Sequence, residues 1–409
     1  MMRALAWIGL VVLGGLLALP VQAAQTEAAS AAPLPPDTTT AQNWPASSVL
    51  GDPFVQRTGK QGLEYLYNMQ FEKARALFEQ IDQRYPNHPV GPFLEGLNIW
   101  WTIMLDLTDT SHDQAFYDAM DEVIERCDKL LDENSDHFDA TFFKGAALGF
   151  RGRLRSNRDR WFKAALDGKN AIGYVRGVSQ RAPSNPDYGF GKGMYDYYAA
   201  IIPEQYPVSK TIMWMLPNGD KERGITLLQR TVEEGWYVRT EAAYFLTQVY
   251  YLYEHDYEKA RFYVRWLRRQ HPNNPFFHNF EGRVYARWGY WTSARKVFTE
   301  VVERCEANEP GYNAHMAEIA HYYLARERLA RREYEDALVH LARLETLASR
   351  DGVDDTRFRV LGYLYQGMVY DAMDKRDMAV NRYRMVLKMD DVYGAHAKAE
   401  RYLDAPYDG

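Results

Sequence analysis

The chain has 409 residues, a formal net charge of −6 and a calculated pI near 6.0, so no basic excess favours nucleic acid as a partner. Its length allows one long repeat array or two to three compact domains. Cys127 and Cys305 are 178 residues apart, and we expect two free, buried, unreactive thiols, with a long-range disulfide as the alternative.

The amino terminus has the pattern of a secretory signal peptide. Arg3 precedes an apolar run over 4–19, and small residues follow up to Ala24. We predict a signal peptide over 1–23, cleaved after Ala23, and therefore a periplasmic or secreted protein. An uncleaved membrane anchor is the alternative. No Cys follows the cleavage site, so no lipid anchor is expected, and no other apolar run approaches the ~20 residues of a membrane span.

Residues 24–53 are rich in Ala, Thr, Ser and Pro. They contain too little apolar surface for a core, so we predict a disordered leader. Trp44 is its one large aromatic residue, and we expect it to dock on the first helical repeat.

A helical array is predicted over 54–392, opening with a clear helix–turn–helix pattern. Small and aromatic residues stand at fixed offsets in this first repeat: Gly62, Tyr65, Ala74, Phe78 and Pro86. The small residues allow two helix backbones to approach, and the proline ends the second helix because it lacks an N–H group. A single repeat cannot bury its own apolar face, so neighbouring repeats must stack.

The next three repeats are less regular. Each first helix carries a glycine at the packing position, at Gly96, Gly145 and Gly193. A long loop over 106–112 separates the helices of the second repeat. An insertion over 203–219, containing the apolar run Ile212–Leu216, interrupts the fourth. We expect this run to pack back onto the array, and a mobile loop that caps the groove or touches a membrane is the alternative.

The pattern is regular again in the carboxyl-terminal half. Ala260 and Ala294 are 34 residues apart, and the packing positions recur with the same offsets in two later repeats: Gly282, Tyr285, Ala294 and Phe298, then Gly367, Tyr370, Ala379 and Tyr383. A period of 34 is that of the tetratricopeptide repeat. Residues 393–409 read as a short capping helix and tail.

On these residues the chain resembles the tetratricopeptide repeat family. The resemblance implies an all-α, right-handed superhelical solenoid of about eight helical hairpins with irregular insertions. It also implies a scaffold that binds proteins or peptides on a concave groove lined by the first helices. The sequence departs from the family pattern at Gln248, where a small packing residue is usual, and lacks the motif Trp in most repeats.

The family register predicts which first-helix residues face the groove. Counting from the packing positions gives four sets: Phe93, Leu97, Trp100 and Trp101; Phe190, Met194, Tyr197 and Tyr198; Phe245, Val249, Leu252 and Tyr253; Phe276, Asn279, Arg283 and Arg287. From these we select as candidate partner-binding residues Trp100, Trp101, Tyr197, Tyr198, Tyr253, Arg283 and Arg287. Aromatic and Arg side chains are typical of binding hot spots. The alternative is that the aromatic residues form core, because the helix around Trp100 is apolar almost all round.

A basic cluster extends from Arg151 to Lys163. It could bind an acidic partner or lipid headgroups, which leaves peripheral membrane contact open, and a solvated turn is the alternative. The chain shows no zinc, nucleophile-elbow or phosphate-loop motif. We therefore expect neither an enzyme, nor a metal, nor a cofactor. The hypothesis is an extracytoplasmic scaffold for a protein or peptide partner, and the alternative is a binding protein for a small apolar or lipidic ligand of the cell envelope.

Overall fold

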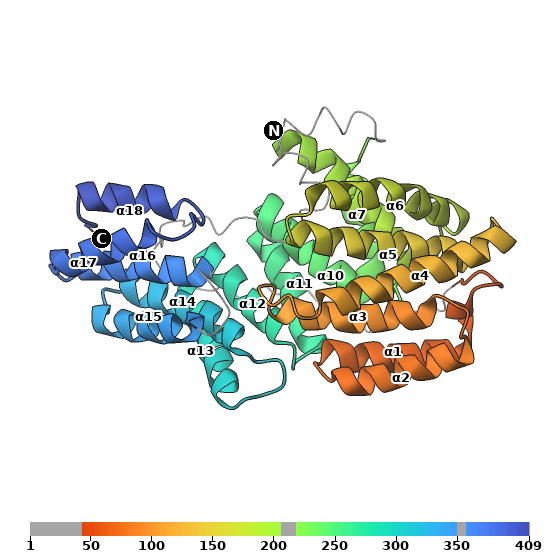
Figure 1. Ribbon diagram of the computed structural model, residues 1–409, viewed down its shortest axis with the longest axis horizontal. Helices are drawn as coiled ribbons and strands as arrows, with labels where there is room; N and C mark the ends of the chain where they lie inside the picture. The colour runs from red at the N-terminus through yellow and green to blue at the C-terminus, as the bar shows by residue number, and fades with distance from the viewer. Residues whose placement is uncertain (1–42, 206–217, 350–356, 409) are drawn as a thin grey trace. The chain divides into compact units, whose positions relative to one another are not determined.

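The computed structural model describes residues 43–205, 218–349 and 357–408. Throughout these ranges the regular structure is helical, with 17 α-helices and no strand (Figure 1). The prediction of an all-α helical-repeat fold is confirmed. The predicted signal peptide and most of the 203–219 insertion lie outside the described residues.

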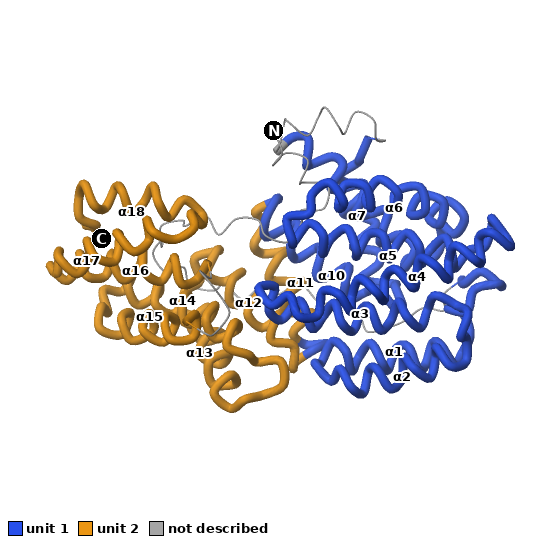
Figure 2. The backbone as a smooth tube through the Cα atoms, viewed as in Figure 1, with its two compact units in different colours: residues 1–14, 32–254, 269–271 blue, residues 15–31, 255–268, 272–409 orange. Residues whose placement is uncertain are grey.

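The chain divides into two compact units (Figure 2). Unit 1 takes its described residues from 43–254 and 269–271, and unit 2 from 255–268 and 272–408. The helices of unit 1 are α1 (Pro53–Tyr67), α2 (Phe71–Arg84), α3 (Val90–Leu105), α4 (Asp113–Glu133), α5 (Phe138–Asn157), α6 (Trp161–Arg181), α7 (Pro186–Gln205), α9 (Lys221–Glu234) and α10 (Arg239–Gln248). Those of unit 2 are α11 (Tyr257–Gln270, whose last two residues belong to unit 1), α12 (Pro275–Trp288), α13 (Trp291–Glu306), α14 (Ala314–Ala330), α15 (Tyr334–Ala348), α16 (Arg357–Ala372), α17 (Arg376–Val386) and α18 (Ala395–Asp404).

The close helix packing that the repeat pattern predicts is present. A glycine of the first helix lies against an aromatic ring of the second in three pairs: Gly62–Phe78, Gly282–Phe298 and Gly367–Tyr383. A Cβ atom at Gly282 would lie 2.6 Å from Phe298 Cζ, closer than real Cβ contacts allow. The ring therefore occupies the space that the glycine leaves open, which is the steric role assigned to these positions from the sequence.

One backbone feature recurs at the turns between paired helices. A residue in the left-handed region, with φ between 52° and 89°, occurs in six of them: Met69, Asp159, His255, Gly289, Arg332 and Asp374. The two remaining pairs are α3/α4, joined through 106–112, and α7/α9, whose connection is partly outside the described residues. These are the two places where the sequence predicts a longer connection.

The unusual residue Gln248 ends α10, and the chain continues as a π-helical turn, η4 (Val249–Tyr253). Gln248 is 4% exposed, and its Nε2 donates a hydrogen bond to Tyr244 Oη at 2.8 Å. The buried amide therefore has a hydrogen-bond acceptor on the preceding turn of its own helix.

Part of the predicted leader is packed against unit 1. Residues 43–52 precede α1, and Leu50 is buried. The Trp44 ring lies 5.6 Å from that of Tyr188 and 5.4 Å from that of Tyr237, so it contacts α7 and the segment before α10. This differs from the disorder predicted up to residue 53 and from the expected docking of Trp44 on the first repeat.

Unit 2 ends on α18, which packs on α16 and α17 and corresponds to the predicted capping helix. The buried carboxylate of Asp371 joins these parts. It accepts hydrogen bonds from Tyr383 Oη at 2.8 Å, from Arg376 Nη1 at 3.0 Å and from the backbone N–H of Tyr407 at 3.0 Å. The residues after α18 are thereby attached to the body of unit 2.

Candidate functional site

Unit 1 contains a recess of about 340 Å³ between its helices. We use "the recess" for this space. Its wall is almost wholly apolar and comes from α1, α3, α5, α6, α7 and α10, with Trp44 and Leu50 from the preceding segment. Aromatic side chains dominate it: Trp44, Tyr67, Phe93, Phe142, Phe143, Phe150, Tyr188, Phe190, Tyr195, Tyr198, Tyr237 and Phe245.

Glycines on α5 help to create the space. Gly145, Gly149 and Gly152 follow one another at spacings of four and three residues and therefore share a helix face. A Cβ atom at Gly145 would come within 2.9 Å of Tyr174 Cβ, so that glycine permits close packing with α6. A Cβ atom at Gly149 would meet nothing within 4 Å. Gly149 thus leaves open volume where any other residue would place a side chain.

Long-range hydrogen bonds close unit 1 around the recess. Glu241 Oε1, on α10, accepts hydrogen bonds from Tyr67 Oη at 3.2 Å and from Trp101 Nε1 at 3.0 Å. Tyr237 Oη donates to the Leu50 carbonyl at 3.0 Å. The first helices of the first and second pairs, α1 and α3, therefore contact α10, the first helix of the fifth pair. In an open array each repeat contacts only its neighbours, so these contacts would be absent.

Three polar atoms beside the recess have no hydrogen-bond partner among the described residues: Arg153 Nε, Tyr198 Oη and Glu241 Oε2. Glu241 is 3% exposed, and burial raises the pKa of its carboxyl group, opposed by Arg153 and by hydrogen bonds from Trp101 and Tyr67. Burial also raises the pKa of Tyr198 well above its ordinary value. Leaving buried polar atoms unpaired is costly, so these three atoms are available to a ligand.

Arg153 is held over aromatic faces. Its guanidinium lies 4.7 Å from the Trp100 ring and 5.0 Å from the Phe245 ring, and Nη2 donates to Tyr244 Oη at 3.2 Å. These contacts fix the side chain and leave Nε–H as its unpaired donor. The positive charge therefore stays beside the recess at a defined place.

A second acid in the wall, Asp187, has a structural role. Its two carboxylate oxygens accept hydrogen bonds from three consecutive backbone N–H groups, those of Trp236, Tyr237 and Val238, at 2.8 to 2.9 Å. It thereby fixes the segment that leads into α10 and brings Tyr237 to the wall.

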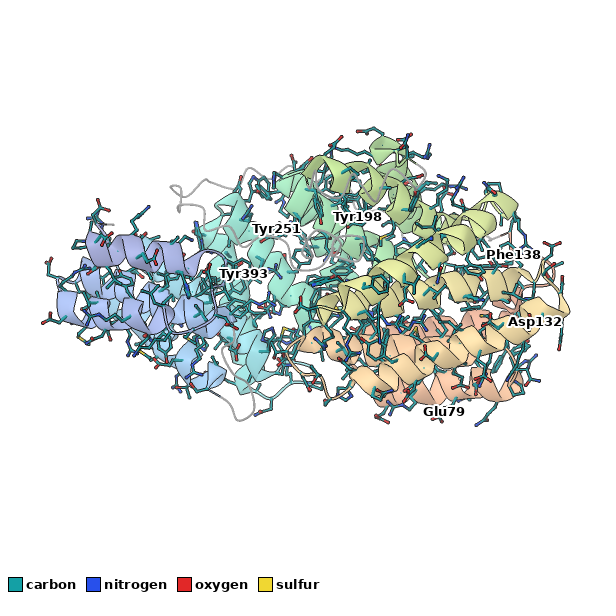
Figure 3. All side chains as sticks on the ribbon, turned by 45° about the horizontal axis from the view of Figure 1, so that its top comes forward. Glu79, Asp132, Phe138, Tyr198, Tyr251 and Tyr393 are labelled. Carbon is teal, nitrogen blue, oxygen red and sulfur yellow. The ribbon has the colours of Figure 1, made fainter. Side chains whose placement is uncertain are left out.

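The predicted partner-binding residues of unit 1 are mostly core. Trp100, Trp101 and Tyr197 are 0% exposed and Tyr198 is 8% exposed, so they offer no open surface, contrary to the hypothesis. Figure 3 shows Tyr198 among the helices of unit 1, whereas the exposed Asp132 lies at its edge. Tyr253 is half-buried in η4, where its ring lies 6.1 Å from that of Tyr197.

Other positions from the same register do face the recess. Six residues that the family count assigns to the inward face line the recess: Phe93, Leu97, Phe190, Met194, Tyr198 and Phe245. These six residues come from α3, α7 and α10. Trp100 and Trp101 do not line the recess and are fully buried, as in the alternative that the aromatic residues form core.

Arg283 and Arg287 belong to unit 2 and do not line the recess. The Arg283 guanidinium lies 5.4 Å from the Phe280 ring. Arg287 Nε donates to Tyr257 Oη at 3.2 Å. Both side chains are half-buried on α12.

The basic cluster predicted from the sequence is largely internal. Asp167 of α6 is 2% exposed and pairs with Arg151 and Arg155. Arg158 pairs with Asp113 through Nε at 2.6 Å. These cations hold α4, α5 and α6 together, and the members of the cluster that remain exposed are Arg160 and Lys163. Sequence spacing showed the Arg residues but not the buried acid that faces them.

The described ranges hold no group of three or more His, Cys, Asp or Glu side chains arranged for a metal ion. They also hold no helix long and apolar enough to cross a membrane.

The paired helices and the recess define a helical-repeat fold with an internal apolar site in unit 1. No family model matches the chain, and no curated protein is significantly similar. Similar solved structures are all of tetratricopeptide proteins. Yeast Tom70 has 9% sequence identity and a TM-score of 0.30, over 87% of this chain and 90% of that chain. The P58(IPK) TPR domain has 14% identity and a TM-score of 0.22, over 87% of this chain and 99% of that chain. A third is Naa15/Naa10 bound to HypK-THB, with 13% identity and a TM-score of 0.33, over 86% of this chain and 74% of that chain.

Proposed function

We propose that this protein is a non-catalytic, extracytoplasmic scaffold that binds a partner polypeptide through the exposed face of α6. The supporting observation is an apolar pair at an unusual place: Phe162 is 78% exposed and Leu166 is 49% exposed. Phe162, Leu166 and Lys169 follow the i, i+4, i+7 spacing of one helix face. The opposite face of the same helix lines the recess.

The positive charge of the exposed α6 face indicates the kind of partner. Lys163, Lys169 and Arg176 are exposed on α6, and the buried acid Asp167 is already paired. An exposed aromatic ring surrounded by cations suits a polypeptide segment that presents acidic and apolar side chains. The proposed binding surface is outside the groove, and it is supported by the burial of the groove positions of unit 1 or their place in the recess wall.

Site-specific photo-crosslinking in the producing cell tests the scaffold. A benzophenone amino acid at position 162 should give one discrete polypeptide adduct, and the matched control at Val339, which is 60% exposed on α15 of unit 2, should not. Reversing the charges with Lys163→Glu and Lys169→Glu should weaken the adduct, as should added salt. An equal adduct from both positions, or one indifferent to charge reversal, contradicts the proposal.

Export is the second part of the proposal. It is supported by the signal-peptide pattern over 1–23. Sequencing the amino terminus of protein from the envelope fraction should find Ala24 first. A chain that begins at Met1 in the cytosolic fraction contradicts export without affecting the binding experiment.

A second candidate function is the binding of a small apolar ligand. The specific observation is the recess, whose volume of about 340 Å³ and aromatic wall fall within the range of small-molecule sites, about 300–1,000 Å³. Mass spectrometry of the protein under native conditions should then show a bound molecule of low mass, independent of the α6 variants.

A further inference from the structure

We infer that the recess of unit 1 binds one neutral amphiphile, a molecule with a hydrocarbon body and a single hydroxyl or amide group. The inference rests on the second candidate function and specifies its ligand. The hydrocarbon body is expected because the wall is built from aromatic and aliphatic side chains of six helices, with little polar surface. The polar group is expected because Arg153, Tyr198 and Glu241 line this apolar space and each has one polar atom without a hydrogen-bond partner among the described residues.

The three polar side chains line the same recess. The Arg153 guanidinium lies 5.0 Å from the ring of Phe245, which follows Glu241 by one turn on the same face of α10. Each polar side chain has one unpaired atom: a donor at Arg153 Nε, an acceptor at Glu241 Oε2, and a hydroxyl at Tyr198 Oη that can do either. A ligand group that both donates and accepts satisfies this set.

A neutral group fits better than an ion. A ligand carboxylate would be attracted by Arg153 but would face the carboxyl group of Glu241, and an ammonium group would face the guanidinium. A hydroxyl or an amide brings no charge, donates to Glu241 Oε2, and accepts from both Arg153 Nε–H and Tyr198 Oη–H. The pairing leaves none of these atoms unsatisfied, which is the condition for burying a polar group.

An extended peptide does not fit the same wall. Every residue of such a chain brings one N–H and one C=O that need partners when buried. Most wall residues offer only apolar side chains. A molecule with a single polar group loses far less on entering the recess than a polypeptide backbone would.

The opening at Gly149 provides the variant that tests occupancy. Gly149 is exposed and lines the recess, and a Cβ atom there meets nothing within 4 Å, so Gly149→Leu would add a side chain at the wall and narrow the recess without displacing a neighbour at the attachment point. Gly173→Leu is the matched control, because this glycine is also in a helix, also has nothing within 4 Å, and does not line the recess. Thermal melting of both variants establishes that each is folded.

The binding experiment uses the purified, delipidated protein and isothermal titration with four probes of one chain length: 1-dodecanol, dodecanamide, dodecanoate and dodecylamine. We expect the alcohol and the amide to bind at least about tenfold more tightly than the two ions near pH 7. Gly149→Leu should abolish binding, Gly173→Leu should retain it, and Glu241→Gln should weaken the alcohol and the amide.

Each contrary outcome has a defined meaning. If dodecanoate or dodecylamine binds more tightly than dodecanamide, and Gly149→Leu still abolishes that binding, the inference of a neutral head group is overturned. The second candidate function, binding of an apolar ligand in the recess, is then retained. If a probe binds Gly149→Leu and Gly173→Leu with equal affinity, the recess is not the binding site. No binding of any probe overturns both the inference and the second candidate function, and leaves the crosslinking result at position 162 unaffected.

Discussion

Trp101 Nε1 donates a hydrogen bond to Glu241 Oε1 at 3.0 Å, although the two residues are 140 positions apart. Tyr67 Oη donates to the same oxygen at 3.2 Å across 174 positions. One carboxylate on α10 therefore joins the first helices of the first and second pairs. In an open array, contacts form only between successive repeats. The Glu241 carboxylate adds contacts between distant repeats of unit 1, and we call this feature the closure of unit 1.

Glu241 should give this closure a pH dependence. Burial raises the pKa of its carboxyl group, so its contribution to stability is full below the ordinary Glu value of about 4.3 and is lost as the pH rises through the raised pKa. Glu241→Gln keeps a carbonyl oxygen for Tyr67 and Trp101 and does not titrate. We expect the melting temperature of the variant, relative to the parent, to increase from pH about 4 to about 8. A difference that stays constant across this range contradicts the assignment.

His271 should act with the opposite sign. Burial lowers its pKa to about 3, and its Nε2 lies 2.8 Å from Thr240 Oγ1. The stability that the neutral ring contributes is present above the ordinary value of about 6.5 and is lost as the pH falls toward 3. His271→Leu should therefore reduce the loss of unfolding free energy between pH about 7 and about 5, measured with urea. An equal loss in the parent and in His271→Leu contradicts the assignment.

The glycine–aromatic contact should be sensitive to a single methyl group. Gly282→Ala would place Cβ 2.6 Å from Phe298 Cζ, and the Phe298 ring is itself stacked on Tyr323 at 4.7 Å. We expect a loss of about 1–3 kcal/mol in the unfolding free energy of unit 2. Gly173→Ala, at an exposed helix position with open space, should be neutral or stabilise by up to about 1 kcal/mol. Equal effects of the two changes would show that steric contact does not decide the outcome.

The carboxylate of Asp371 should be essential to the end of unit 2. Asp371→Ala leaves Tyr383 Oη and Arg376 without this acceptor and releases the backbone of Tyr407. A loss of about 2–4 kcal/mol is expected in urea unfolding. Tyr383→Phe removes one of the hydrogen bonds and should cost about 1 kcal/mol. If the two variants lose the same amount, the carboxylate does not join the three groups.

The two thiols should react slowly in the folded protein. Cys127 is buried and Cys305 is half-buried, both are free, and burial raises the pKa of each to about 12. The thiolate is the reactive form, so alkylation by iodoacetamide near pH 8 should be slow for both residues and should become fast in denaturant. Peptide mass spectrometry resolves the two sites. Rapid labelling of folded Cys127 would contradict its buried position.

The repeat pattern predicted most of the fold because its constraints are local. A glycine such as Gly282 and its ring at Phe298 belong to one hairpin, so spacing along the chain is enough to place both. The same reasoning placed Phe93 and Phe190 correctly in the wall of the recess. These positions depend on helix geometry over a few turns.

The burial of Trp101 could not be predicted in this way. Its indole is covered because α10 lies against α3, and no short-range spacing records a contact across 140 positions. The basic cluster has the same explanation, since Arg151 and Arg155 pair with Asp167 from the next helix. The available atoms at Arg153 and Glu241 depend on those long-range contacts as well, and the sequence carried no signal that distinguishes these two charged residues from the others on α5 and α10.

The closure of unit 1 also determines how many hairpins this unit can contain. In an open array, a duplicated or deleted repeat changes the length and leaves the remaining interfaces as they were. In unit 1, a deleted pair between α3 and α10 would carry Glu241 away from both Tyr67 and Trp101. Gain or loss of a hairpin between α3 and α10 would therefore break both hydrogen bonds to Glu241, so the closure favours one number of hairpins in unit 1.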